Sequence, residues 1–212
     1  MSRTWAAAVL ALVFAGSAGS GLLAIRSKPK EADASKTSSA AIATEALNSG
    51  LKRLDKADQI ASKNPKQARK EYEAALKDFQ AAATAAPDNY RAHNGAGYSL
   101  RKLGDYQRAL ESYERAVALA PSSSEAIEYR AEAYLGLNRL NDAKQAYMHL
   151  FVHDRTASNV LIKAMKAWVE KRRAQPAGVD AATVDAFDTW VRERDTLAAS
   201  VVNLGHNSPD WK

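Results

Sequence analysis

A 34-residue repeat constrains the fold of this chain more than any other feature of its sequence. At this offset Leu103 aligns with Leu137, and Tyr113 aligns with Tyr147. Self-similarity at such a period is typical of helical hairpins that stack side by side, because a single hairpin cannot bury its apolar face alone. The sequence therefore predicts an all-α chain made of stacked helical hairpins.

The segment Ala92–Pro121 resembles a tetratricopeptide repeat. Small and aromatic residues at fixed positions carry the resemblance: Gly97, Gly104 in the turn, Tyr106, Ala109, Tyr113, Ala116 and the terminal Pro121. A third repeat keeps Ala131, Tyr134, Ala143 and Tyr147, with Arg155 in place of the proline. The resemblance covers roughly Pro65–Asp154. The motif is specific for fold and poor for function. The resemblance implies a non-enzymatic scaffold that binds other proteins.

Apolar periodicity, capping residues and Gly or Pro breaks divide the chain into helices. We expect a divergent first hairpin that starts near Ala41 and whose second helix follows Asn64, a good N-cap. From this second helix onward, the expected helices are Pro65–Ala85, Tyr90–Leu103, Tyr106–Leu119, Glu125–Gly136, Asp142–His153, Ala157–Ala174 and Asp180–Val202. The predicted fold is thus a tetratricopeptide-like α-solenoid of about three hairpins over residues 41–156, closed by two C-terminal capping helices over residues 157–204.

Two kinds of core position follow from this fold. Gly97 and Ala109 are small because the two helix axes of a hairpin must approach to about 8–10 Å there. Trp168 and Trp190 lie on apolar stripes of the two last helices, and an open stack needs such helices to cover its last apolar face. Core packing is therefore the expected role of both tryptophans, with partner contact as the alternative. Asp185 and Asp188 beside that stripe are expected to be solvated.

The ends of the chain carry no repeat. Residues 1–25 contain Arg3 and then an apolar stretch, which predicts either a cleaved signal peptide or an N-terminal membrane anchor through residues 5–25. In both cases we expect the repeats outside the cytoplasm, exported or tethered to the membrane. Residues 26–40 are rich in Lys, Ser and Ala and predict a flexible linker, and residues 205–212 an unstructured tail.

Charge and composition exclude several classes of function. The net charge of +6 arises entirely in residues 1–77, whereas residues 78–212 are balanced. Nucleic-acid binding would need a clustered basic stripe with stacking aromatics, and none is visible. The chain has no cysteine, so it has no disulfide framework or thiolate site. The oligomeric state is open.

The resemblance also implies a concave groove lined by the first helix of each hairpin. The expected partner-binding residues are Arg91, Asn94, Tyr98, Arg101, Glu125, Glu128, Tyr129 and Glu132. They could bind an extended peptide or a partner helix; alternatively Arg91 pairs with Glu125 across the helices and the face satisfies itself. If the groove binds, reversing the charges of Glu128 and Glu132 should abolish capture without lowering stability.

Some members of the family bind acidic chaperone C-termini through a carboxylate clamp. The clamp needs Lys and Arg where this chain has Glu125 and Tyr129, so such binding is not expected. His149 and His153 share a helical face but lack a third metal ligand. No nucleophile, phosphate-binding or dinucleotide motif is present, so we expect no enzyme activity, cofactor or metal. The alternative function is a structural subunit of an envelope complex that docks through the Trp-bearing end helices.

Overall fold

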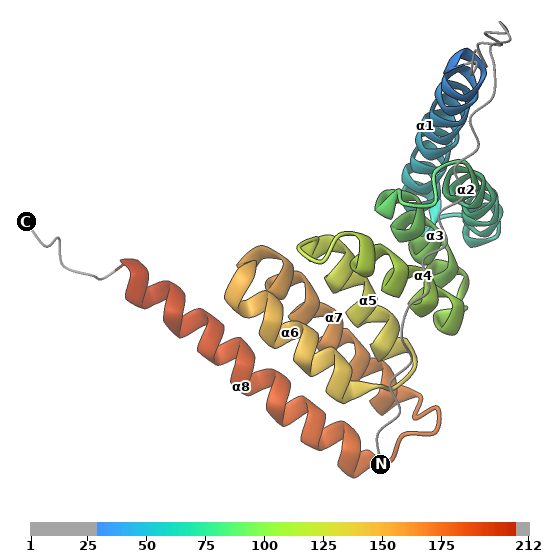
Figure 1. Cartoon of the computed structure of the whole chain (residues 1–212). Coiled ribbons are helices and arrows are strands. Elements are labelled where there is room, and N and C mark those ends of the chain that lie inside the picture. Colours follow the sequence, from blue (N-terminus) through green and yellow to red (C-terminus); the bar gives the residue numbers. More distant parts are fainter. Residues whose placement is uncertain (1–28, 207–212) are drawn as a thin grey trace, which may run out of the picture.

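The computed structural model describes residues 29–206, and within this range every secondary-structure element is an α-helix. Figure 1 shows these helices as an array with α1 and α8 at its opposite ends. Their bounds are α1 Pro29–Ile60, α2 Pro65–Ala85, α3 Tyr90–Leu103, α4 Tyr106–Leu119, α5 Ser124–Gly136, α6 Leu140–His153, α7 Arg155–Ala174 and α8 Ala181–His206. The predicted all-α fold is confirmed.

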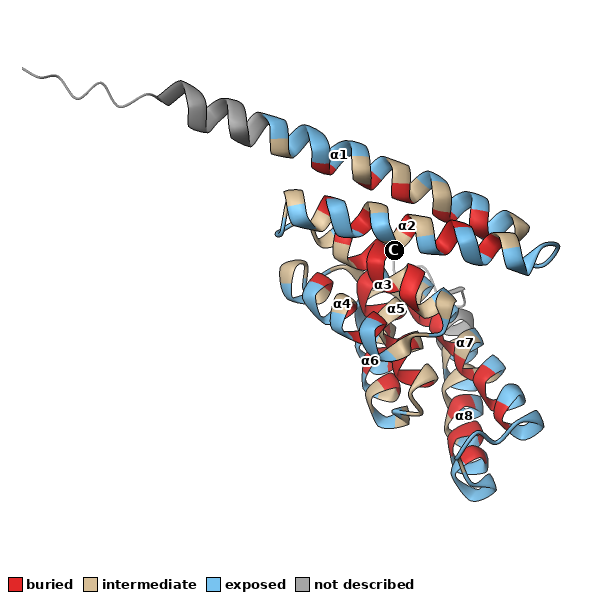
Figure 2. Ribbon diagram, turned by 90° about the vertical axis from the view of Figure 1, so that its right-hand side faces the viewer, coloured by how far each residue is buried: buried red, intermediate tan, exposed pale blue. Residues whose placement is uncertain are grey.

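Consecutive helices form the predicted hairpins. Helices α1 and α2, α3 and α4, and α5 and α6 pack as pairs, and each pair also packs on the next. Helix α7 contacts both α5 and α6, and α8 packs on α7. Buried residues on α1 face α2, while the opposite side of α1 is exposed (Figure 2). The first helices of successive hairpins lie side by side, because α3 contacts both α1 and α5.

Side-chain caps explain why the helices begin where they do. The Asn64 carboxamide oxygen accepts a hydrogen bond from the backbone N–H of Gln67 at 3.1 Å, and Pro65 occupies the first helical position. Asp105 caps α4 and Asp154 caps α7 in the same way. The bounds predicted for α2, α3 and α4 are confirmed at both ends.

Small residues let the helices approach closely around large aromatic rings. The ring of Tyr113 is fully buried, and a Cβ atom added to Gly97 would lie 2.7 Å from it. A Cβ atom on Gly95 would lie 2.5 Å from the buried ring of Phe79. Because real Cβ atoms do not approach that closely, the predicted packing role of Gly97 is confirmed.

The closing helices carry their tryptophans inside. Trp168 is buried, its indole N–H donates to the backbone carbonyl of Leu135 at 2.7 Å, and its ring lies edge-on to Phe187. Trp190 is partly buried and meets the edge of Tyr147 with ring centroids 5.6 Å apart. Core packing, the expected role of both tryptophans, is confirmed.

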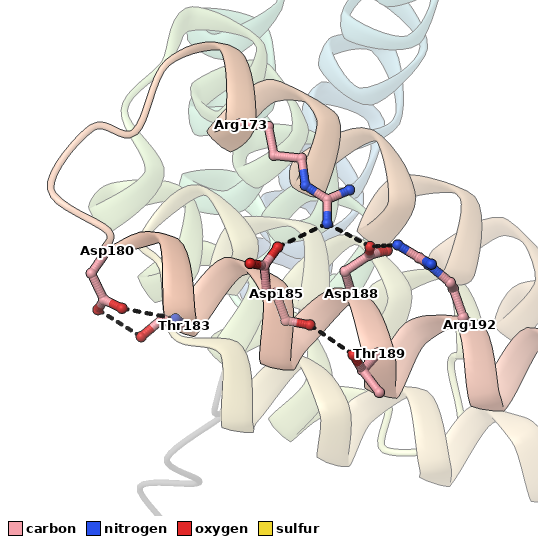
Figure 3. Close-up of polar contacts among 7 residues, drawn as sticks. All are labelled: Arg173, Asp180, Thr183, Asp185, Asp188, Thr189 and Arg192. Atoms are coloured by element: carbon pink, nitrogen blue, oxygen red, sulfur yellow. Dashed lines mark hydrogen bonds and ion pairs between the residues drawn. The ribbon is translucent and has the colours of Figure 1, made fainter.

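A salt-bridge cluster joins α7 to α8, and here one expectation was wrong. Asp188 is buried and accepts hydrogen bonds from Arg173 at 2.7 Å and from Arg192 (Figure 3). Hydrogen bonds from Arg192 outweigh burial and, with those from Arg173, hold the pKa of Asp188 below its usual value. Arg173 also reaches the exposed Asp185. Asp188 is thus a structural link, because α7 brings a cation to its side of α8.

Other expectations on helix ends need correction. Helix α1 begins at Pro29, so residues 29–40 of the expected linker are helical. This segment has no apolar stripe, but Pro at the first helical position and several Ala, Lys and Glu residues favour a helix. Helix α8 continues to His206, into the expected tail. The leader and the rest of the tail lie outside the described residues. From residue 29 to residue 206, no helix combines the length and hydropathy of a membrane span.

Candidate binding groove

A hollow of about 190 Å³ opens between the first helices of the three hairpins. We call it the α1–α3–α5 groove. Its lining residues are Leu51, Leu54, Asp55 and Asp58 from α1, Arg91, Asn94, Gly95 and Tyr98 from α3, and Glu125 and Tyr129 from α5. Residues three or four apart on one helix share a face, which explains why each helix contributes such a set.

Asp58 is the polar centre of the α1 side. Its carboxylate accepts hydrogen bonds from the hydroxyl groups of Tyr72, at 2.5 Å, and Tyr98, at 2.7 Å. The ammonium of Lys102 lies 3.1 Å from it. Partial burial acts to raise the pKa of Asp58, but these hydrogen bonds outweigh it and hold that pKa below the usual value. Asp58 therefore remains ionised and ties α1 to α2 and α3.

Two tyrosine rings form the wall between α3 and α5. The ring centroids of Tyr98 and Tyr129 are 5.2 Å apart, and the guanidinium of Arg101 lies over both rings. Arg101 also forms an ion pair with Glu132 and donates to the hydroxyl of Tyr113 at 3.3 Å. Its charge is thus fully engaged inside the protein.

Two buried acceptors at this face have no hydrogen-bond partner among the described residues. They are Oδ1 of Asn94 and Oε1 of Glu128, and each residue is 6% exposed. Burial raises the pKa of Glu128 to about 7; Arg101 opposes the shift and Glu125 adds to it. An unmade hydrogen bond of a buried polar group costs about 1–3 kcal/mol. Such sites merit a functional explanation.

The structure brings five of the predicted residues together in the groove: Arg91, Asn94, Tyr98, Glu125 and Tyr129. Arg101 and Glu132 pair with each other instead and line the neighbouring hollow. No ion pair joins Arg91 to Glu125 in the described part of the chain. The face does not satisfy itself in the way that the alternative required.

One expectation about the groove was wrong. Reversing the charges of Glu128 and Glu132 cannot leave stability unchanged, because Glu128 is buried and Glu132 holds the largely buried Arg101. Removing one partner of a buried pair leaves an uncompensated charge. Exposed residues of the groove, such as Arg91 and Glu125, are the ones that can be altered without this penalty.

Sequence reasoning missed the contribution of α1. Leu51, Leu54, Asp55 and Asp58 share one face of that helix, but α1 does not match the repeat motif and no groove positions could be transferred to it. The available signal was the three- and four-residue spacing of two leucines and two aspartates near the helix end. The role of Asp58 depends on its hydrogen bond with Tyr98, which lies 40 residues further along the chain.

A second hollow of about 350 Å³ lies between α3, α5 and α7. Its wall includes Trp168, Lys171 and Arg172, next to the Arg101–Glu132 pair. Arg172 is buried and donates to the carboxamide oxygen of Asn138 at 3.0 Å. This hollow is more basic than the α1–α3–α5 groove, but its buried cation is already bound.

No set of three or more metal-ligating side chains comes together within residues 38–200, whose side chains the structure describes. His149 and His153 stack with ring centroids 4.4 Å apart, and Nδ1 of His153 lies 2.8 Å from the backbone carbonyl of His149. The latter contact orients His153 within its own helix. The pair has the geometry of two stacked rings at a helix end.

Comparisons with known proteins agree with this architecture. Two models of the tetratricopeptide repeat family match, one over residues 60–124 and the other over residues 100–168. A comparison with curated proteins gave no match. Between them the two models cover residues 60–168. Three solved structures are similar to part of the chain at low identity.

The second tetratricopeptide domain of Spaghetti (RPAP3), solved with an HSP90 peptide, is 20% identical, with a TM-score of 0.40 over 51% of this chain and 94% of that one. The first such domain of human RPAP3 is 22% identical, with a TM-score of 0.45 over 60% and 98%. The Arabidopsis OM64 domain is 16% identical, with a TM-score of 0.44 over 59% and 98%. The two family models alone identify the family, and they place tetratricopeptide repeats over residues 60–168 of this chain.

Proposed function

We propose that this protein is a non-enzymatic scaffold that binds a segment of another protein in the α1–α3–α5 groove. One observation carries the proposal: the first helices of three hairpins converge on one open hollow that aromatic, apolar and charged side chains line. Grooves of this kind suit extended peptides, whose backbone supplies donors and whose side chains enter small pockets.

The exposed charges of the groove support binding over self-satisfaction. Arg91 and Glu125 are both exposed, and neither has an ion-pair partner among residues 38–200, whose side chains the structure describes. By contrast, the cations deeper in the face, Arg101 and Lys102, are paired with Glu132 and Asp58. Free charges at the rim of a groove can steer and orient a charged partner.

The proposed place of action is outside the cytoplasm, with the protein exported or tethered to the cell envelope. The support is the sequence pattern of residues 1–25, which has a basic start, an apolar run and small residues after it. Docking through the Trp-bearing end helices gains no support, because Trp168 is buried in the core and Trp190 packs against that core.

Capture from an envelope extract of the native cells tests the proposal. The full chain serves as bait beside the Arg91→Ala/Glu125→Ala variant, which alters only exposed groove residues. The control is Glu111→Ala/Arg115→Ala, which removes the same side-chain types from exposed positions of α4. We expect the control to retain the bound proteins, identified by mass spectrometry, and the groove variant to lose them. An identical set for both variants would contradict the groove.

A further inference from the structure

The rim of the α1–α3–α5 groove has more negative than positive charge. Asp55, Asp58 and Glu125 line it, whereas Arg91 is its one lining cation among the described residues. Asp55 and Glu125 are exposed, and no described cation lies within ion-pair distance of either. Their field therefore extends into the groove and attracts cations.

Two further cations near this rim, Lys102 and Arg101, are already engaged. Lys102 binds Asp58, and Arg101 binds Glu132 and lies over the rings of Tyr98 and Tyr129. The unpaired charges of the lining are therefore two carboxylates, Asp55 and Glu125, against one guanidinium, Arg91.

The polar and apolar parts of the groove specify the form of the occupant. Asn94 lines the groove, and a side-chain carboxamide can form hydrogen bonds with the backbone of an extended segment. Leu51 and Leu54 add an apolar wall to the same lining as the rings of Tyr98 and Tyr129. An apolar side chain of the same segment would cover this wall.

We infer, on the basis of the proposed function, that the groove binds an extended segment in which a Lys or Arg side chain stands beside an apolar one. The cationic head group pairs with Asp55 and Glu125, the apolar side chain packs on Leu51 and Leu54, and the backbone forms a hydrogen bond with the carboxamide of Asn94. This charge preference is opposite to that of a groove that holds an acidic C-terminus.

Selection of peptides from a random displayed library on the full immobilised chain tests this preference. Enriched peptides are synthesised, and their affinities are measured by fluorescence anisotropy. The groove variant is Asp55→Asn/Glu125→Gln, and the control with the same charge change is Glu111→Gln/Glu114→Gln on α4. We expect Lys- or Arg-rich peptides whose binding weakens about ten-fold in the groove variant and not in the control. Added salt should weaken binding to the wild type most.

The remaining outcomes separate the two ideas. Acidic or uncharged peptides that lose affinity in Tyr98→Ala but not in Asp55→Asn/Glu125→Gln would overturn the charge preference and keep the groove. Peptides that bind equally well to wild type, to Tyr98→Ala and to Leu51→Ala, with circular dichroism showing all three folded, would overturn both. A library without any binder would count against both as well.

Discussion

Glu128 should make the protein less stable as the pH rises through neutrality. Burial raises the pKa of this carboxyl group to about 7 in the folded chain, from an ordinary value of 4.5. The side chain is 6% exposed and its Oε1 has no hydrogen-bond partner in the described structure. Between these two pKa values the folded chain keeps a proton that the unfolded chain has lost.

The sign and size of the effect follow from proton linkage. Because the folded state binds more protons between pH 4.5 and pH 7, the free energy of unfolding falls as the pH rises through this window. One pKa unit corresponds to about 1.4 kcal/mol. From pH 5 to pH 8 the loss is about 2–3 kcal/mol, a large part of the stability of an ordinary domain. Below pH 4.5 this contribution is constant.

Urea unfolding followed by circular dichroism at several pH values measures this loss. Glu128→Gln keeps the shape of the side chain and cannot ionise, so its stability should be nearly flat over the same window. Glu111→Gln is the control, since it removes an exposed carboxylate of α4 that does not contribute to the raised pKa of Glu128. A Glu128→Gln variant with the slope of the wild type would refute the assignment of the loss to this residue.

Three further predictions concern the packing and capping of the helices. Gly97→Leu should lower the free energy of unfolding by about 1–3 kcal/mol, because the new side chain would overpack against Tyr113. An unchanged melting temperature would contradict this. Tyr72→Phe should cost about 1 kcal/mol at pH 7 in urea unfolding, and the difference should shrink as the pH falls below 3.8, because the hydrogen bond helps to lower the pKa of Asp58. Asp154→Ala should cost about 0.5–2 kcal/mol by removing the cap of α7, whereas Asp154→Asn should retain most of it; equal losses in thermal melts would argue against a capping role.

The helices of the repeat were predictable because local signals and the 34-residue period agree. Asn64, Asp105 and Gly104 stop or start helices through their own backbone and side-chain hydrogen bonds, which depend on neighbours a few residues away. A helix boundary can be predicted from sequence where such local signals agree with the repeat period. Helix α1 lacks both the motif and a complete apolar stripe, so its start at Pro29 was missed.

The pairing of charged side chains was less predictable. The period places Arg91, Arg101, Glu125 and Glu132 on one face, but it leaves open which cation meets which carboxylate. The structure pairs Arg101 with Glu132 and leaves Arg91 apart from Glu125. Long side chains choose partners by rotamer and helix offset, which no single sequence reveals. The same holds for Asp58, which joins tyrosines of two different helices.

Charged groups that have a partner stabilise the fold, whereas charged groups without one are free to take part in the proposed binding. Arg101, Lys102 and Arg172 each hold a described partner, so removing any of them breaks contacts that fix neighbouring helices. Asp55 and Glu125 hold no described ion-pair partner, so changing them alters the field of the groove with little effect on helix packing. Variants of the first kind should therefore lower the melting temperature whether or not a partner binds. Variants of the second kind should alter only binding, which makes the groove experimentally separable from the scaffold that carries it.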